Sequence, residues 1–120
     1  MTSDVPPSLV WSEAHDGVAV VRFRGDLDSF GGNDMRKCCL SLLDDGTPSV
    51  VLDLSQTTYF DSRGLTDLLV VHHHSGGSAG QRVRLVVNGL VRRRLVATGT
   101  AALWPLHETL GDAVSAASGA

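Results

Sequence analysis

The sequence has little positive charge. Its ten lysine and arginine residues are outnumbered by thirteen aspartate and glutamate residues, which gives a formal charge of −3 at pH 7. Nucleic-acid-binding domains present a basic face, so this balance gives no reason to expect a nucleic-acid partner. The one basic run, residues 92–94, lacks both interleaved aromatic side chains and a second basic cluster.

The sequence also lacks long apolar segments. No run reaches the length of a membrane-spanning helix, and the N-terminus has no basic-then-apolar signal pattern. We therefore expect a soluble cytoplasmic protein without direct membrane insertion. A length of 120 residues with 42% apolar residues suits one compact core. We assign residues 8–117 to a single domain, residues 1–7 to a flexible N-terminal tail and residues 118–120 to a flexible C-terminal tail.

Cysteine is scarce, and its placement argues against a disulfide. Cys38 and Cys39 are adjacent, whereas an ordinary disulfide needs separated backbones. Both belong to an apolar pattern at helical spacing that also includes Met35, Leu42 and Leu43. We expect both cysteines to be buried as small hydrophobic side chains.

The motifs of common enzymes are missing as well. There is no Gly-x-x-x-x-Gly-Lys-Ser/Thr loop and no Gly-x-Gly-x-x-Gly after a strand. Residues 60–64 do not match a Gly-x-Ser-x-Gly nucleophile elbow around Ser62, because Phe60 occupies the position of the first glycine. The consecutive histidines 72–74 point about 100° apart on a helix, so they cannot converge on one metal ion. We expect a protein that is not an enzyme, with no catalytic residue, cofactor or metal.

Strand and helix patterns alternate along the chain. Strands are expected at residues 9–11, 18–24, 50–54, 83–87 and 103–106, and helices at residues 29–43, 62–72, 88–99 and 106–117. The turn at residues 15–17 joins the first two strands into an antiparallel hairpin. The alternation that follows predicts an α/β fold, a mixed sheet of about five strands whose later members run parallel, with about four helices.

The most informative stretch is residues 58–65. It follows the buried strand at residues 50–54, and we expect residues 58–60 to form a loop leaving that strand. Asp61 and Ser62 are both favoured helix N-cap residues, so the next helix begins near Ser62. A hydroxyl at this position is exposed and lies beside the helix N-terminus, where an anion is well tolerated.

Residues 61–65, Asp-Ser-Arg-Gly-Leu, resemble the Asp-Ser-Ser/Thr-Gly-Leu signature of bacterial anti-sigma factor antagonists, which belong to the STAS domains. Three other stretches agree with this family in order. Residues 25–28 resemble its Gly-Glu-Leu-Asp, residues 91–95 resemble its third helix, and residues 106–113 resemble its last helix. The resemblance covers residues 8–117 and implies the STAS fold.

The resemblance implies roles for individual residues. In these antagonists the first serine of the signature is the phosphoacceptor, and Ser62 occupies that place. Asp28 and Asp61 match two acidic positions that flank the acceptor, although capping of helices is an equal alternative for both. Arg63 departs from the family, which has serine or threonine there, and Asp26 stands where the family has glutamate. The residues implied in partner binding are Asp26, Asp28, Asp61, Ser62, Arg63, Gly64 and Leu65.

The function implied is regulation of a sigma factor by partner switching. The unphosphorylated protein would bind an anti-sigma factor that is a serine-protein kinase, phosphorylation on Ser62 would release it, and a serine phosphatase would restore it. One alternative is a STAS subunit of a stress-sensing or transporter-associated complex. Another is a nucleotide-binding or catalytic module, which the missing motifs disfavour.

Overall fold

The computed structural model describes residues 8–119, so the expected N-terminal tail at residues 1–7 lies outside the described part. Strands and helices alternate along that part. In chain order they are β1 (Ser8–His15), β2 (Val18–Leu27), α1 (Ser29–Asp44), β3 (Val50–Phe60), α2 (Ser62–His74), β4 (Val83–Val86), α3 (Gly89–Ala97), the short 3-10 helix η1 (Ala101–Leu103), β5 (Leu106–His107) and α4 (Leu110–Ala117).

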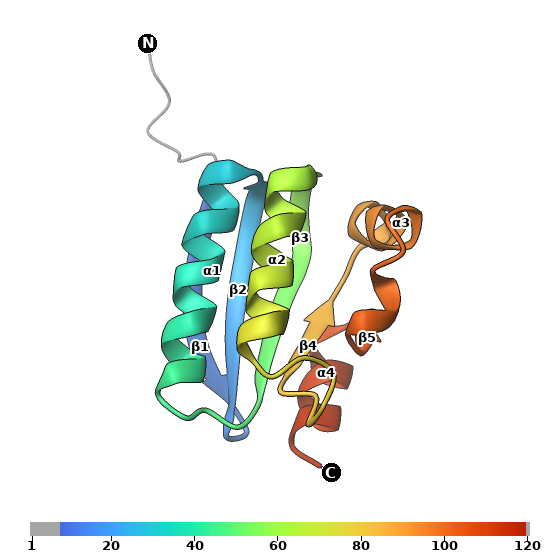
Figure 1. Cartoon of the computed structure of the whole chain (residues 1–120). Coiled ribbons are helices and arrows are strands. Elements are labelled where there is room, and N and C mark those ends of the chain that lie inside the picture. Colours follow the sequence, from blue (N-terminus) through green and yellow to red (C-terminus); the bar gives the residue numbers. More distant parts are fainter. Residues whose placement is uncertain (1–7, 120) are drawn as a thin grey trace.

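The strands form one mixed sheet in the order β1-β2-β3-β4-β5 (Figure 1). β1 and β2 are antiparallel, and the turn between them uses Asp16 and Gly17, both with positive φ. The pairs β2-β3, β3-β4 and β4-β5 are all parallel. The α/β fold with an antiparallel first hairpin and parallel later strands is therefore confirmed.

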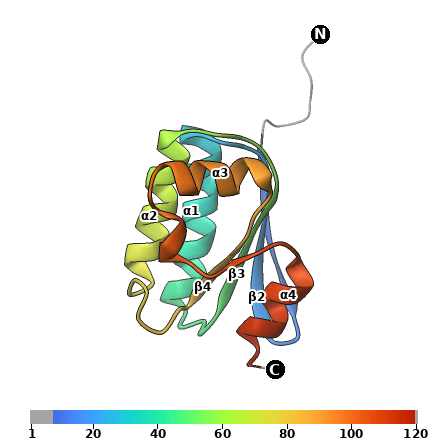
Figure 2. The ribbon, with the colours of Figure 1, turned by 90° about the vertical axis from the view of Figure 1, so that its right-hand side faces the viewer.

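Helices cover the sheet on both faces (Figure 2). α1, α2 and α3 lie on one side and enclose the main core, whereas α4 lies on the other side over a smaller apolar cluster. Alternate residues of β2 supply the two cores, because side chains along a strand point to opposite faces. Val21 and Phe23 join the main core, and Val18 and Val20 pack beneath α4.

The sequence-based boundaries of β3, of the fifth strand and of the last helix are wrong. The strand expected at residues 103–106 begins only at Leu106, because Leu103 belongs to η1. β3 continues to Phe60, so residues 58–60 belong to a strand and not to a loop; they remain paired with the end of β2 through Tyr59 and Phe60. The last helix begins at Leu110, because Leu106 and His107 pair with β4 as a fifth strand. Glu108 and Thr109 separate that strand from α4, and the Oγ1 atom of Thr109 caps the helix.

The cysteines lie in α1, as expected, but only one is fully buried. Cys39 joins Met35 and Leu43 in the core, whereas Cys38 is half-buried. Burial raises the pKa of both thiols. The expectation that both are buried is therefore correct only for Cys39.

The histidines 72–74 form the last turn of α2 and point to different neighbours. The His72 ring meets the buried Trp104 ring edge-on, with centroids 5.4 Å apart. His74 bonds through Nε2 to the Asp44 carboxylate of α1, at 2.6 Å. Residues 8–119 contain no group of three or more side chains able to hold a metal ion.

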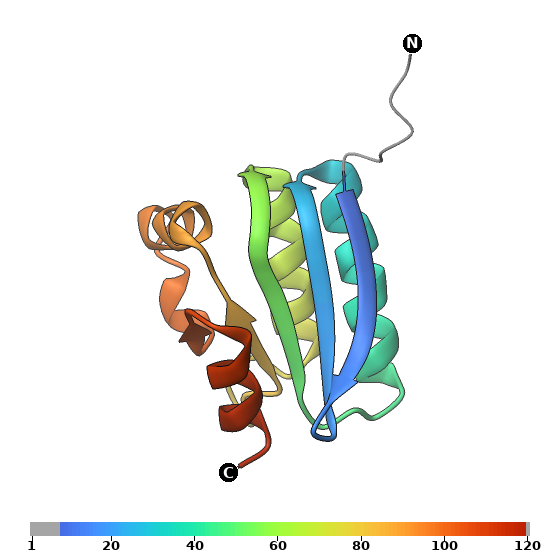
Figure 3. The ribbon, with the colours of Figure 1, turned by 180° about the vertical axis from the view of Figure 1, so that it is seen from behind.

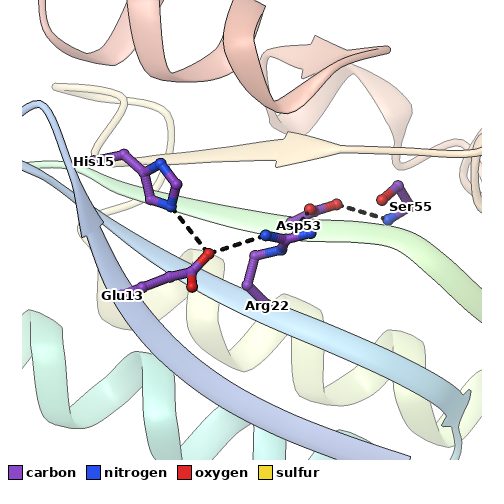
Figure 4. A network of polar contacts seen from close by, with 5 residues as sticks. All are labelled: Glu13, His15, Arg22, Asp53 and Ser55. Carbon is purple, nitrogen blue, oxygen red and sulfur yellow. Dashed lines mark hydrogen bonds and ion pairs between the residues drawn. The ribbon is translucent and has the colours of Figure 1, made fainter.

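On the face of the sheet that carries α4, no helix lies over β1, as the view from behind shows (Figure 3). A polar network extends over this face (Figure 4). The Arg22 guanidinium bonds to the Glu13 carboxylate at 2.9 Å and to the buried Asp53 carboxylate at 3.0 Å, and His15 also contacts Glu13. The network thus compensates a buried carboxylate placed in the apolar first half of β3.

Candidate functional site

The candidate site lies where β2 and β3 end and α1 and α2 begin. The two strands are parallel neighbours, and Leu27 at the end of one pairs with Phe60 at the end of the other. Each strand is followed by a helix that returns along the same face, so the N-termini of α1 and α2 lie side by side at the top of the molecule (Figure 1). The residues singled out in the sequence at positions 26–28 and 61–65 are thereby brought together.

The two helices start with the same local geometry. Asp28 Oδ1 accepts hydrogen bonds from the backbone N–H groups of Phe30 and Gly31, at 3.1 and 2.9 Å. Asp61 Oδ1 accepts bonds from Arg63 and Gly64 in the same way, both at 3.0 Å. Both aspartates are N-caps, and each satisfies two N–H groups that the helix itself leaves unpaired.

Glycines allow the N-termini of both helices to pack directly against the end of β2. A Cβ atom on Gly31 would overlap the backbone carbonyl oxygen of Asp26, and one on Gly64 would overlap that of Leu27. Gly32 is restricted less strictly, because a Cβ there would overlap the side-chain carboxylate of Asp67 in α2 and not a backbone atom. The contacts of Gly31 and Gly64 set the position of both helix N-termini relative to the end of β2. They therefore also set the position of the residues around Ser62.

Ser62 is the first residue of α2, and its side chain is exposed. Within residues 8–119 its Oγ atom has no hydrogen-bond partner, and its carbonyl accepts a bond from Thr66 Oγ1 at 2.9 Å. Capping is performed by Asp61, so the Ser62 hydroxyl is not needed for the helix. It is a free hydroxyl at a positive helix end, where a phosphate would be electrostatically favoured.

The other predicted site residues divide into exposed and buried groups. Arg63 is exposed, and Asp26 is half-buried, with its carboxylate accepting a bond from Thr58 Oγ1 at 3.3 Å. Gly64 and Leu65 are buried. They support the site through packing, and only the exposed and half-buried members can touch a partner directly.

Several residues at this site were not singled out in the sequence. Phe30 is 77% exposed and Tyr59 is 49% exposed, both unusually high for large aromatic side chains. Arg94 of α3 donates from Nε and Nη2 to the Phe60 carbonyl, at 3.0 and 2.8 Å, which ties α3 to the end of β3. Tyr59 and Arg94 lie in stretches noted in the sequence, but no local pattern gave them a role. Their positions at the site follow from tertiary contacts with the ends of β2 and β3.

Arg36 and Asp67 form an ion pair between α1 and α2 at 3.1 Å, just below the helix N-termini. Burial raises the pKa of Asp67, and the Arg36 guanidinium partly opposes this shift. The pair joins the two helices where Gly32 allows them to approach closely.

A mixed sheet with this order, with two helices capped side by side over its end, defines a small α/β domain. The chain belongs to the STAS domain family, whose pattern it matches over residues 11–113. None of the helices in the described part is long and apolar enough to span a membrane.

Solved structures of similar fold include several anti-sigma factor antagonists. One, from Mycobacterium paratuberculosis, is 30% identical with a TM-score of 0.82, and the match covers 92% of this chain and 93% of that one. SpoIIAA in its unphosphorylated form has a TM-score of 0.73 at 15% identity, over 93% and 98% of the two chains. Phosphorylated SpoIIAA from Bacillus has a TM-score of 0.64 at 15% identity, over 90% and 98%. The chain therefore resembles these antagonists over nearly its whole length.

Proposed function

We propose that the chain is an anti-sigma factor antagonist that works by reversible binding. The unphosphorylated form binds an anti-sigma factor and so releases a sigma factor; phosphorylation of Ser62 ends the binding. The observation that carries the proposal is the exposed, unbonded Ser62 hydroxyl at the start of α2, in a chain 30% identical to an antagonist. SpoIIAA, which shares the fold, has been solved both with and without a phosphate.

In this proposal the partner is a serine-protein kinase and the chain is its substrate and ligand, not an enzyme. The γ-phosphoryl group of ATP passes to Ser62 Oγ, the hydroxyl proton leaves to a base on the kinase, and ADP departs. A serine phosphatase hydrolyses the phosphate and regenerates the binding form. We place all of these steps in the cytoplasm, where sigma factors act.

The proposed contact surface consists of Asp26, Asp28, Asp61, Ser62 and Arg63, supported from below by the buried Gly64 and Leu65. A phosphate on Ser62 adds nearly two negative charges and three acceptor oxygens. At a helix N-terminus this group meets positive partial charge, so the fold tolerates it. The effect of phosphorylation is then confined to the surface.

The proposed phosphorylation can be tested with the kinases encoded in the same genome as the chain. The purified chain is incubated with ATP and, in turn, with each serine kinase of the histidine-kinase ATPase fold encoded there, and phosphorylated sites are mapped by mass spectrometry. We expect one phosphate, on Ser62. Ser29 is an internal control, because it follows the Asp28 cap as Ser62 follows the Asp61 cap, and is also exposed. Phosphate on Ser29 alone, or on neither serine with any kinase, would contradict the proposal.

Asp28 allows capping and partner binding to be separated. Asp28→Asn keeps an oxygen able to accept the N–H bonds of Phe30 and Gly31, so we expect the free energy of unfolding to change little. Asp28→Ala removes the cap and should cost about 1 kcal/mol. If the carboxylate charge belongs to the contact surface, Asp28→Asn slows Ser62 phosphorylation at unchanged melting temperature. An Asn variant phosphorylated at the wild-type rate would restrict Asp28 to capping.

A further inference from the structure

A groove of about 460 Å³ lies beside Ser62, between the first turns of α1 and α2. Phe30 and Arg36 line it from α1, and Arg63 and Asp67 line it from α2. Since Arg63 directly follows Ser62, the groove adjoins the proposed phosphoacceptor. It is therefore part of the surface that a partner bound at Ser62 would cover.

The groove carries positive charge on a chain whose formal charge is −3. Its one carboxylate, that of Asp67, is already paired with Arg36. The nearby carboxylates of Asp28 and Asp61 accept backbone N–H groups as helix caps. Both keep their negative charge, which the positive helix ends partly offset. Within residues 8–119 the Arg63 side chain has no ion pair or hydrogen bond, so among the residues that line the groove its guanidinium is the cation without a bonded carboxylate.

Phe30 adds an apolar anchor at the rim of the groove. Its side chain is 77% exposed, although it lies only two residues after the Asp28 cap. An aromatic ring held on the first turn of a helix loses little conformational freedom when it is buried by a partner. Aromatic and arginine side chains are also the types that most often dominate binding energy at interfaces.

We infer that this groove recognises an acidic segment of the anti-sigma factor, with a carboxylate opposite Arg63 and an apolar pocket around Phe30. The inference rests on the proposed function and adds the chemistry of the partner. It also gives the phosphate a second effect. A phosphoserine at position 62 places two negative charges beside Arg63, which neutralises the groove and repels the acidic segment.

The test measures the dissociation constant of the kinase that phosphorylates Ser62, by titration calorimetry with the unphosphorylated full chain. We expect Arg63→Gln and Phe30→Ala each to weaken binding about tenfold or more. Arg63→Gln should also flatten the dependence of affinity on salt, because exposed charge pairs are screened. Phe30→Ala should leave that dependence as in the wild type. Both side chains are exposed, so melting temperatures should stay near the wild-type value.

The controls remove the same kinds of group elsewhere. Lys37→Gln deletes an exposed charge on α1 outside the groove, and Val96→Ala trims an apolar side chain on α3 that is 63% exposed. Both should bind as the wild type does. If Arg63→Gln and Phe30→Ala also bind as the wild type does, the groove inference is wrong while the proposed function stands.

Two further outcomes would also overturn the inference about the groove. If the wild-type chain neither binds nor is phosphorylated by any kinase of its genome, the proposed function fails and the inference fails with it. A second copy of the chain is the competing occupant of the groove. Sedimentation that finds a dimer of the isolated chain, dissociated by Phe30→Ala, would assign Phe30 to self-association and overturn the inference.

Discussion

Replacing Arg22 with methionine should lower the free energy of unfolding by about 3 kcal/mol, because the buried Asp53 carboxylate then loses the one cation that pairs with it within residues 8–119. The side chain of Asp53 is 4% exposed, and its Oδ2 atom lies 3.0 Å from Arg22 Nε. Its Oδ1 atom accepts only the Ser55 N–H, at 2.9 Å. Arg22 itself is 25% exposed, so water can partly replace it and the loss should stay near the lower end of the range for buried pairs.

Urea unfolding followed by circular dichroism measures this loss, and Arg24→Met is the matched control. Arg24 lies on the same face of β2, two residues on, and its guanidinium lies 5.8 Å from the centre of the Trp11 ring. It is exposed and pairs with no carboxylate in the described part of the chain, so its replacement should cost about 1 kcal/mol or less.

A double variant separates the buried charge from lost packing. Arg22→Met combined with Asp53→Leu removes both charges, and we expect it to recover most of the stability lost in Arg22→Met alone. Equal losses in Arg22→Met and Arg24→Met would mean that the Asp53 carboxylate does not depend on Arg22.

The helix starts could be predicted from the sequence because they depend on local chemistry. Asp28, Asp61 and Asn88 are N-caps in the structure, and each is followed by the expected helix. The parallel direction of the later strands followed from the alternation of strands and helices, since parallel neighbours need crossover helices. Their order in the sheet did not. The grouping of Asp28 and Asp61 around Ser62 was implied by the resemblance to the STAS domains, and parallel strands that end together place these residues side by side.

What the sequence could not supply were contacts between distant segments. Glycine is a poor helix former, so Gly31 and Gly32 disfavour the start of α1 locally, whereas in the structure they allow close contact with Asp26 and Asp67. β3 was expected to end early because its apolar run stops after Leu54, yet pairing with β2 carries it to Phe60. The roles of Phe30 and of the Arg22–Asp53 pair likewise depend on contacts with segments that are distant in the sequence.

The chain phosphorylated on Ser62 should bind its anti-sigma factor at least about 100-fold more weakly than the bare chain, which corresponds to roughly 2.7 kcal/mol. A partner that fits closely over the hydroxyl meets a bulky dianion, which costs free energy to desolvate. The same dianion neutralises Arg63, the cation of the adjoining groove without a bonded carboxylate. Both effects lower the affinity for the partner and do not require a change in the fold.

The fold should hardly respond to the same phosphate. Asp61 already caps α2, and the added charge lies at the positive end of the helix dipole. We therefore expect an unchanged circular dichroism spectrum and a melting temperature within about 3 °C of the bare chain. A phosphate that unfolds the chain would mean that release follows from lost structure and not from a changed surface.

Substitutions at Ser62 separate charge from the hydroxyl itself. Ser62→Ala cannot be phosphorylated and should bind whether or not ATP is present, because the hydroxyl has no partner within residues 8–119. Ser62→Asp carries one charge where phosphoserine carries nearly two, so we expect binding weaker than in the alanine variant but stronger than in the phosphorylated chain. Ser115→Asp adds the same charge on α4, on the opposite face of the sheet, and should bind as the wild type does. Calorimetric titration of all four forms against one kinase gives the order directly; Ser62→Asp binding as tightly as Ser115→Asp would show that charge at position 62 is not what ends the complex.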